Sequence, residues 1–314
     1  MEHCQTTGAT APLSTLAHSE EWFGAFRDYW WNADFLDLMA RRWQLAQHQS
    51  LLDIGCGQCH WSRLLAPRMA VGAQVTAFDR DVKWAAGDPS ISTAFAAFGA
   101  KVQFQQGDAH ALPFDDDSFD VVTCQTVLMH LADPLAALLE MRRVVRPGGI
   151  VICTEPCNLA QFALSNATTT DLSIDELCDA FRYALLCERG KRASEEGSLS
   201  LGDRLPRLFQ LAGLSGIQTY LSDKASPILP PYQDHETRVN LAELIAAHED
   251  ARAGLWESQV DDWIAALNDV EAQALVARIH AERPEGQRKL QAMIEAQSYW
   301  DSGATLTYLV SASK

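Results

Sequence analysis

The chain has 314 residues, of which 47% are hydrophobic and 9% aromatic, an ordinary composition for a folded protein with one large core or two modest ones. Its formal net charge is −16, so nucleic-acid binding, which depends on Lys and Arg neutralising phosphates, is not expected, and a small or uncharged partner fits better. No apolar run approaches the ~18 residues of a membrane span, and residues 1–18 lack the basic and apolar segments of a secretion signal, so we expect a disordered N-terminal arm and a cytoplasmic protein.

The first predicted elements are one or two amphipathic helices over residues 19–46, where apolar residues recur at three- and four-residue spacing. Within this segment Tyr29, Trp30 and Trp31 exceed what one helix face needs for packing. They fit either aromatic anchors that fasten the helix to a sheet or a lid over a ligand, and we favour the anchors.

A strand, a tight turn and a helix are predicted over residues 51–65. Two aliphatic residues lead into Asp53, Gly55 and Gly57 lie one residue apart, and His60 opens the helix. Glycine permits positive φ and leaves the backbone bare, while a helix N-terminus offers unpaired N–H groups to an anion. The turn therefore predicts a small, partly anionic ligand; a turn without a ligand is the alternative. A dinucleotide is disfavoured, because its motif places a third glycine where His60 stands.

Further strands alternate with helices along the rest of the chain. One ends in Asp79, and the next leads into Gly107-Asp108-Ala109 and then into L-P-F. A helix with Asp133 as its N-cap and Pro134 in its first turn runs to R-P-G-G, just before another strand. These predicted strands cover residues 74–79, 101–106, 119–124, 150–155, 217–221 and 305–310.

Together these motifs resemble the class I S-adenosylmethionine-dependent methyltransferases, the Rossmann-like methyltransferase superfamily. The glycine turn is similar to their first motif, D-x-G-x-G-x-G, with Cys59 in place of the last glycine, and the resemblance covers residues 50–155 well. It implies an α/β fold: a seven-stranded, mostly parallel Rossmann-like sheet with an antiparallel last strand, N-terminal helices, and helical insertions covering the active site.

The resemblance also implies S-adenosylmethionine as the cofactor and S-adenosylhomocysteine as its product, with no metal. Asp53 is expected to contact the cofactor's amino group, and the backbone of residues 55–57 its methionine part. Asp79, or alternatively Asp81, is expected to bind the ribose hydroxyls, and Asp108 the adenine amino group. The predicted cofactor-binding residues are Asp53, Gly55, Cys56, Gly57, Asp79, Arg80, Asp108, Ala109 and Gln125.

Eight cysteines are scattered without the dense spacing of a disulfide scaffold, which predicts reduced thiols. Cys56 and Cys59 have the spacing of a redox pair or half a zinc site, but no second C-x-x-C accompanies them. Cys153 and Cys157 bracket the end of a predicted strand, which leaves chemistry on a soft metalloid open.

Two segments interrupt the alternation of strands and helices. The first contains a predicted helix over residues 171–186 and a loop over residues 190–200, and the second is wholly helical. Both are expected to project from the strand ends near the cofactor and to cover the active site; a dimer surface is the alternative. The predicted division is an arm (1–18), N-terminal helices with the cofactor-binding core (19–156), a helical insertion (157–202), core continuation (203–231), a helical cover (232–296) and the last core strand (297–314).

The predicted reaction is in-line methyl transfer to a small-molecule acceptor, with O-, N- and S-methylation left open and an amino-acid or thioether-like acceptor considered. His130 is the first candidate for a general base and Glu155 the second, although a neutral acceptor atom needs none. Tyr29, Arg182 and Arg204 are candidate substrate contacts, the arginines because a guanidinium pairs well with a carboxylate. The alternatives are a methyltransferase acting on a macromolecule and a non-catalytic S-adenosylmethionine-binding protein; a monomer or homodimer is expected.

Overall fold

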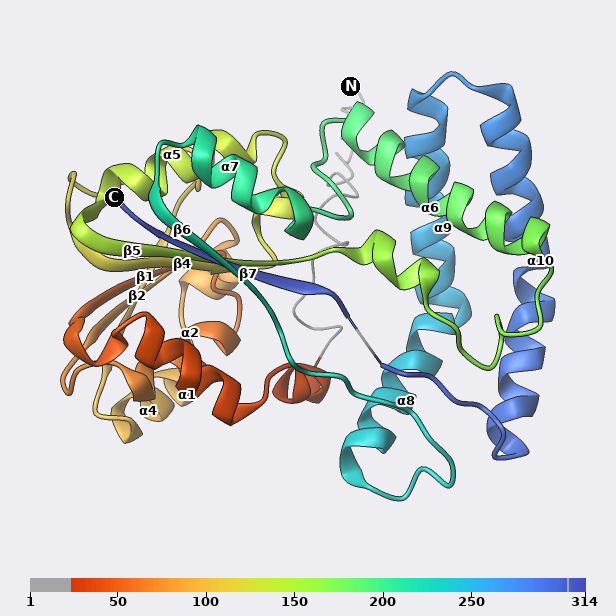
Figure 1. Ribbon diagram of the computed structural model, residues 1–314, viewed down its shortest axis with the longest axis horizontal. Coiled ribbons are helices and arrows are strands. Elements are labelled where there is room, and N and C mark those ends of the chain that lie inside the picture. Colours follow the sequence, from red (N-terminus) through yellow and green to blue (C-terminus); the bar gives the residue numbers. More distant parts are fainter. Residues whose placement is uncertain (1–23, 304) are drawn as a thin grey trace, which may run out of the picture.

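The computed structural model describes residues 24–303 and 305–314, so the arm predicted over residues 1–18 lies outside the described residues. Figure 1 shows a sheet with helices on both faces and, to one side of it, a block of long helices. A 3-10 helix (Gly24–Tyr29) and α1 (Ala33–Arg42) precede the first strand, in the segment where amphipathic helices were predicted.

The sheet has seven strands in the order β3-β2-β1-β4-β5-β7-β6. Strands β1 to β5 pair in parallel, whereas β7 runs antiparallel to both β5 and β6. The predicted α/β fold, with a mostly parallel sheet and an antiparallel last strand, is confirmed. The strands are β1 (Ser50–Ile54), β2 (Gln74–Asp79), β3 (Lys101–Gln106), β4 (Phe119–Gln125), β5 (Val145–Pro156), β6 (Ser215–Leu221) and β7 (Thr307–Ser313).

Successive residues of the central strands enter two different cores, because side chains alternate between the faces of a sheet. Leu51 and Val121 pack into the core on one face, and their neighbours Leu52 and Val122 into the core on the other. Covering both faces explains why these strands read as continuous hydrophobic runs. The helices on the first face are α1, α2 (His60–Leu65) and α4 (Pro89–Ala97), and those on the second are α5 (Pro134–Val144) and α7 (Leu205–Leu211).

The longest described helices form the helical block beside the sheet (Figure 1). A separate core that includes Cys187, Trp263 and Val276 joins three of them. Within the described residues, no helix combines the length and the apolar character that crossing a membrane requires. The block consists of α6 (Ile174–Ala193), α8 (His235–His248), α9 (Asp250–Ala266) and α10 (Val270–Glu295).

Some predicted element boundaries are wrong. The loop predicted over residues 190–200 begins late, because α6 continues through Gly190 to Ala193. A Cβ atom at Gly190 would lie 2.5 Å from the backbone oxygen of Trp263, so this glycine lets α6 and α9 approach closely rather than ending the helix. Strand β5 also begins earlier than predicted, at Val145, which pairs with Phe119 before a register shift.

Candidate active site

The residues predicted to bind the cofactor lie at or near one edge of the sheet, where the parallel strands β1, β2, β3 and β4 end. Ile54 of β1 is in register with Phe78 of β2 and with Cys124 of β4, so the residues that follow all three strands lie together. Ligands of open α/β sheets bind at this carboxyl edge. The predicted cofactor residues are therefore brought to one place by strand pairing.

The turn after β1 is held against the end of β2. The N–H groups of Gly55 and Cys56 both donate to the Phe78 carbonyl, at 2.7 and 3.1 Å. Gly55 has φ +64°, and a Cβ atom there would lie 2.5 Å from Cγ2 of Val127. Both the backbone conformation and the close approach of the chain after β4 therefore require glycine at this position.

Asp79 ends β2 and contacts the same turn directly. Its Oδ2 accepts a hydrogen bond from the Gly57 N–H at 3.0 Å, and its Oδ1 accepts one from the Asp81 N–H at 2.9 Å. Burial raises the pKa of Asp79, while these two N–H donors act in the opposite direction. Each carboxylate oxygen has two lone pairs, so each can accept one more hydrogen bond from a ligand.

Cys59, which replaces the last glycine of the motif, adopts the left-handed conformation that glycine favours, with φ +59°. Its side chain is fully buried in the core with Leu51 and Val75. The thiol therefore packs inward, beneath the turn. A hydrogen bond with Cys59 and burial both raise the pKa of the Cys56 thiol, which disfavours the thiolate that metal binding requires. Among the described residues, no three His, Cys, Asp or Glu side chains are grouped as a metal site.

The remaining predicted cofactor residues differ in exposure. Asp53 lies within β1 and is only 1% exposed. Asp108, after β3, has a 61% exposed side chain and accepts hydrogen bonds from the N–H and Nδ1 of His110, at 2.9 and 2.8 Å. These bonds hold the pKa of Asp108 below its ordinary value, so the carboxylate is ionised at neutral pH. Ala109 is buried, Arg80 is exposed, and Gln125 ends β4 half-buried.

Comparison with known proteins identifies the segment that contains these residues. A protein family described as a methyltransferase domain matches residues 52–153. The match begins inside β1 and ends inside β5, so it contains the glycine turn, Asp79 and Asp108. Residues 52–153 are thus the part of the chain that is similar to a methyltransferase domain.

Relatives of this methyltransferase domain include two bacterial demethylmenaquinone methyltransferases. The protein from Staphylococcus epidermidis is 38% identical over 104 residues, which cover 33% of this chain and 42% of the relative. The protein from Bacillus subtilis is 34% identical over 117 residues, which cover 37% of this chain and 49% of the relative. The chain thus spans less than half the length of these relatives.

Solved structures with a similar fold have low sequence identity. Phosphoethanolamine N-methyltransferase 2 from Haemonchus contortus, solved with S-adenosyl-L-methionine, is 16% identical with a TM-score of 0.47, covering 98% of this chain and 60% of that one. The [4+2]-cyclase SpnF is 20% identical with a TM-score of 0.46, covering 90% of this chain and 81% of that one.

Glu155, the second candidate base, lies near the end of β5, just beyond the matched methyltransferase domain. It is fully buried, and its Oε1 accepts hydrogen bonds from the N–H groups of Val127 and Leu128, at 2.9 and 2.7 Å. Burial raises the pKa of Glu155 to about 8, although the N–H donors oppose the shift. At neutral pH this carboxyl group is therefore mostly protonated, and it fixes the turn that follows β4.

A buried lysine of the helical block interacts electrostatically with Glu155, and no local pattern in the sequence indicates it. Lys191 of α6 is 3% exposed, and its ammonium group lies 5.6 Å from the ring centroid of Trp263. Burial lowers the pKa of Lys191 to about 8, while Glu196, Glu188 and Glu155 favour its charged form. Sequence reasoning missed Lys191 because it belongs to the part of α6 that was predicted as a loop.

His130, the first candidate base, lies on the turn that Glu155 fixes. The turn (Leu128–His130) is a single 3-10 segment, and His130 is half-buried. The Ser198 N–H donates to the Met129 carbonyl at 2.7 Å, so the loop after α6 packs directly against this turn. A Cβ atom at Gly197 would lie 2.3 Å from the same carbonyl oxygen. The helical insertion therefore contacts the methyltransferase domain beside His130.

The predicted substrate residues lie apart from one another. The Tyr29 hydroxyl group makes a 2.5 Å hydrogen bond with Nδ1 of His235, linking the N-terminal segment to α8. Arg182 lies on the surface of α6 with a 66% exposed side chain, 3.7 Å from Asp179. Arg204 is engaged with Glu188 at 3.2 Å, as well as with Ser198 and the Ser200 carbonyl. The structure does not bring these three side chains together.

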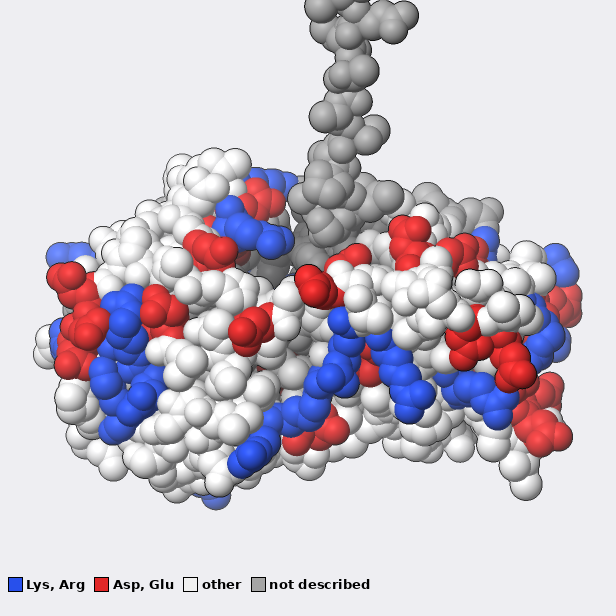
Figure 2. Space-filling view, turned by 90° about the horizontal axis from the view of Figure 1, so that it is seen from above, with Lys and Arg blue, Asp and Glu red and all other residues white. Residues whose placement is uncertain are grey.

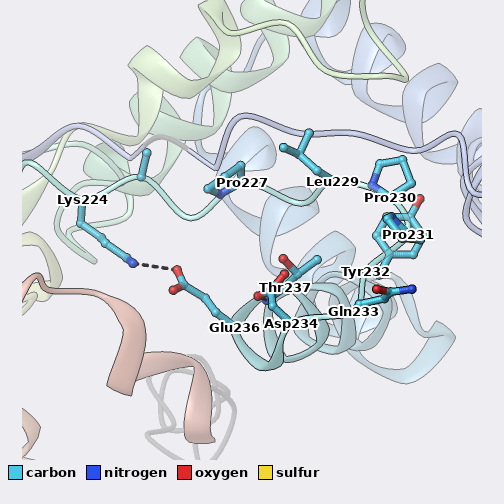
Figure 3. A pocket seen from close by; sticks show the side chains of 11 residues that line it. Lys224, Pro227, Leu229, Pro230, Pro231, Tyr232, Gln233, Asp234, Glu236 and Thr237 are labelled. Carbon is cyan, nitrogen blue, oxygen red and sulfur yellow. Dashed lines mark hydrogen bonds and ion pairs between the residues drawn. The ribbon is translucent and has the colours of Figure 1, made fainter.

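Two large cavities lie away from the carboxyl edge, and none of the predicted site residues lines either of them. The first, of about 500 Å³, lies between the chain that follows β6 and the start of α8 (Figure 3). An ion pair of 2.8 Å between Lys224 and Glu236 borders it. The second, of about 490 Å³, lies within the helical block.

Figure 2 shows Lys and Arg interspersed with Asp and Glu on the face seen from above.

Proposed function

We propose that the protein is an enzyme that transfers a methyl group from S-adenosylmethionine to a small-molecule acceptor. The observation that carries this proposal is the 3.0 Å contact between the Gly57 N–H and the Asp79 carboxylate. It joins the two motifs assigned to the cofactor, within the segment that matches a methyltransferase domain. Both motifs lie at the edge of the sheet where open α/β folds bind ligands.

The residues at this edge fit the cofactor. The turn over residues 55–57 offers bare backbone, and the Asp79 carboxylate has lone pairs for two hydroxyl groups, as a ribose requires. The ionised Asp108 fits the adenine amino group. The buried Asp53 fits a cationic amino group, because a charge of opposite sign offsets the desolvation of a buried carboxylate. We therefore retain the predicted cofactor set, with Cys56, Arg80, Ala109 and Gln125 as its neighbouring members.

When bound, S-adenosylmethionine supplies an electrophilic methyl group attached to a sulfonium sulfur. The chain must then align an acceptor atom with that group, exclude water and, where the acceptor carries a proton, remove it. We propose His130 as the group that accepts this proton. Glu155 is buried and bonded to two backbone N–H groups, so we propose that it positions the turn carrying His130.

The acceptor is a separate question, because the family match ends at residue 153 and the helical block lies beyond it. We propose that the insertion packed beside His130 encloses the acceptor and selects it. Two relatives are named demethylmenaquinone methyltransferases, so demethylmenaquinone is the first acceptor to assay. Tyr29, Arg182 and Arg204 stay predictions as acceptor contacts, as do a cytoplasmic location and a monomeric or homodimeric state.

The test is incubation of the protein with S-adenosylmethionine labelled in its methyl group, first with demethylmenaquinone and then with fractionated small metabolites. Mass spectrometry then identifies products that carry the label. We expect a labelled small molecule with the wild-type protein and much less of it with Asp79→Ala at a limiting concentration of S-adenosylmethionine. Tight cofactor binding without any labelled small molecule would contradict the proposal.

A further inference from the structure

The cavity of about 490 Å³ in the helical block is built by four helices that belong to no part of the cofactor edge. Its volume is in the range of small-molecule sites in proteins. Tyr183, on its wall, precedes Lys191 by eight residues in α6, which corresponds to roughly 12 Å along the helix axis. None of the residues predicted to bind the cofactor or to act as a base lines the cavity, so it is distinct from the predicted methyl-transfer site. Its aromatic and histidine lining consists of Tyr183, His248, Trp256, His280 and Tyr299.

The rings on this wall are held in fixed orientations. Trp256 packs edge-to-face against the buried Trp263, with ring centroids 5.4 Å apart. Its Nε1–H donates to the Tyr183 hydroxyl oxygen at 3.3 Å, and this hydroxyl group lies 3.2 Å from Nε2 of His280. On the far side of the imidazole, Nδ1 lies 3.5 Å from Asp261. The same hydroxyl group also hydrogen-bonds with the Cys187 side chain, so three neighbours hold the Tyr183 ring in place.

The charged groups of the cavity are already paired. Arg283 and Glu257 form an ion pair of 2.6 Å, and Oδ1 of Asp301 accepts a hydrogen bond from the Gly303 N–H at 2.6 Å. Nδ1 of His248 lies 2.8 Å from the Leu244 carbonyl oxygen, the geometry of a donated hydrogen bond. An anionic ligand would therefore have to break an existing ion pair, whereas an uncharged ligand would not.

We propose that this cavity is a second binding site, which takes an uncharged planar aromatic molecule. Its rings stack among Trp256, Tyr299 and the neighbouring apolar side chains. Leu244, Ile279 and Leu290 complete the apolar part of the lining.

The chain offers a matched pair of glycines with which to test the site. Gly286 of α10 lines the cavity, and a Cβ atom added there meets nothing within 4 Å. Gly254 of α9 is equally open but does not line it. Both glycines lie inside helices, where leucine is the better helix former, so both leucine variants are expected to fold. Only Gly286→Leu places a side chain in the ligand's space.

The probe is 2-naphthol, titrated into the protein without S-adenosylmethionine and followed by tryptophan fluorescence and calorimetry. We expect wild type to bind one equivalent, Gly286→Leu to bind about tenfold or more weakly, and Gly254→Leu to bind like wild type. Equal affinity of wild type and Gly286→Leu would overturn the proposal. So would displacement of 2-naphthol by saturating S-adenosylmethionine, because the probe would then occupy the cofactor cleft.

These assays need no methyl transfer, so the second site can fail while the proposed enzymatic function stands, and the reverse also holds.

Discussion

Asp79 is the residue on which cofactor binding should depend most, because its carboxylate links the glycine turn to the end of β2. We predict that Asp79→Ala weakens S-adenosylmethionine binding by roughly 10- to 100-fold, the loss expected for hydrogen bonds to a charged acceptor. Isothermal titration calorimetry measures this change directly. Unchanged affinity would remove Asp79 from the cofactor site.

Asp88→Ala is the matched control for this carboxylate. Asp88 caps α4 by accepting a hydrogen bond from the Ser90 N–H at 2.6 Å. Its loss should lower the free energy of unfolding by about 1 kcal/mol and leave cofactor affinity unchanged. The comparison separates a binding role from a general loss of stability.

Glu155 should make stability depend on pH, because burial raises its pKa from 4.5 to about 8. Between these values the folded state holds a proton that the unfolded state has released, so stability falls as pH rises from 4.5 to 8. One pKa unit corresponds to about 1.4 kcal/mol, so the fall should reach a few kcal/mol. Urea unfolding at pH 5 to 8.5 should show it for wild type and not for Glu155→Gln.

The Lys191→Met variant distinguishes the contribution of Lys191 to the pH dependence of stability from that of Glu155. The lowered pKa of Lys191, about 8 against 10.5 ordinarily, makes its own contribution to stability rise with pH only between these values. The Lys191→Met variant should therefore keep the fall between pH 4.5 and 8 and lose the rise above pH 8. A flat profile below pH 8 in this variant would contradict the assignment to Glu155.

At the scale of elements, the contact between the loop after α6 and the turn (Leu128–His130) should depend on the small size of Gly197 in that loop. Gly197 has φ +94°, and a Cβ atom there would lie 2.3 Å from the Met129 carbonyl oxygen. We predict that Gly197→Ala lowers the free energy of unfolding and reduces acceptor turnover more than cofactor affinity. Chemical denaturation and steady-state kinetics measure the two effects.

Gly216→Ala provides the comparison, since Gly216 also has positive φ, +63°, but meets nothing within 4 Å of an added Cβ atom. It should show the backbone strain alone, about 1 kcal/mol, without the clash. Gly197→Ala should destabilise the protein by about 1–3 kcal/mol more. Equal effects of the two substitutions would mean that the loop moves away from the turn without cost.

At the scale of the whole molecule, we expect cofactor binding to reduce backbone mobility in the methyltransferase domain and also in the insertion that packs against it. We predict that S-adenosylmethionine slows hydrogen exchange over residues 53–59 and 107–112, and also over residues 126–131 and 195–200. The second pair of segments is joined by the Ser198–Met129 hydrogen bond and carries no predicted cofactor contact. Protection should not extend to α10, which lies on the outer side of the block (Figure 1).

Exchange confined to the first pair of segments would show that the insertion does not respond to the cofactor. The helical block would then be a separate binding unit or a partner surface rather than a cover. The measurement thus tests the predicted division of the chain into a core and a cover.

Much of the fold could be predicted because its signals are local. Asp133 caps α5, as predicted, by accepting a hydrogen bond from the Ala136 N–H at 3.0 Å, and Pro134 occupies the first turn. The central strands read as hydrophobic runs, since both faces of the sheet are covered. The residues predicted to bind the cofactor could also be selected from the sequence, because each lies at or just after the end of a strand of a parallel sheet, and such strands end at a common edge.

The rest of the site could not be read from the sequence. Gly190 looked like a helix terminator, yet it lies inside α6, where the backbone of α9 approaches. Lys191 lies in the segment that was predicted as a loop, yet it is buried in α6, where Glu155 favours its charged form. Arg204 was a candidate for a substrate carboxylate, but it is bonded within the loop after α6. Each of these outcomes depends on contacts between residues far apart in the chain.

The sequence by itself determined the alternation of strands and helices, the glycine turn and the carboxylates placed to receive a cofactor, because hydrophobic periodicity and turn chemistry act between near neighbours. Only the tertiary structure decided that Glu155 holds the turn carrying His130, that Glu155 favours the charged form of the buried Lys191, and that residues of four helices contribute to one aromatic cavity. Burial and its effects on charge are properties of the assembled chain, since they are set by which distant surfaces exclude water.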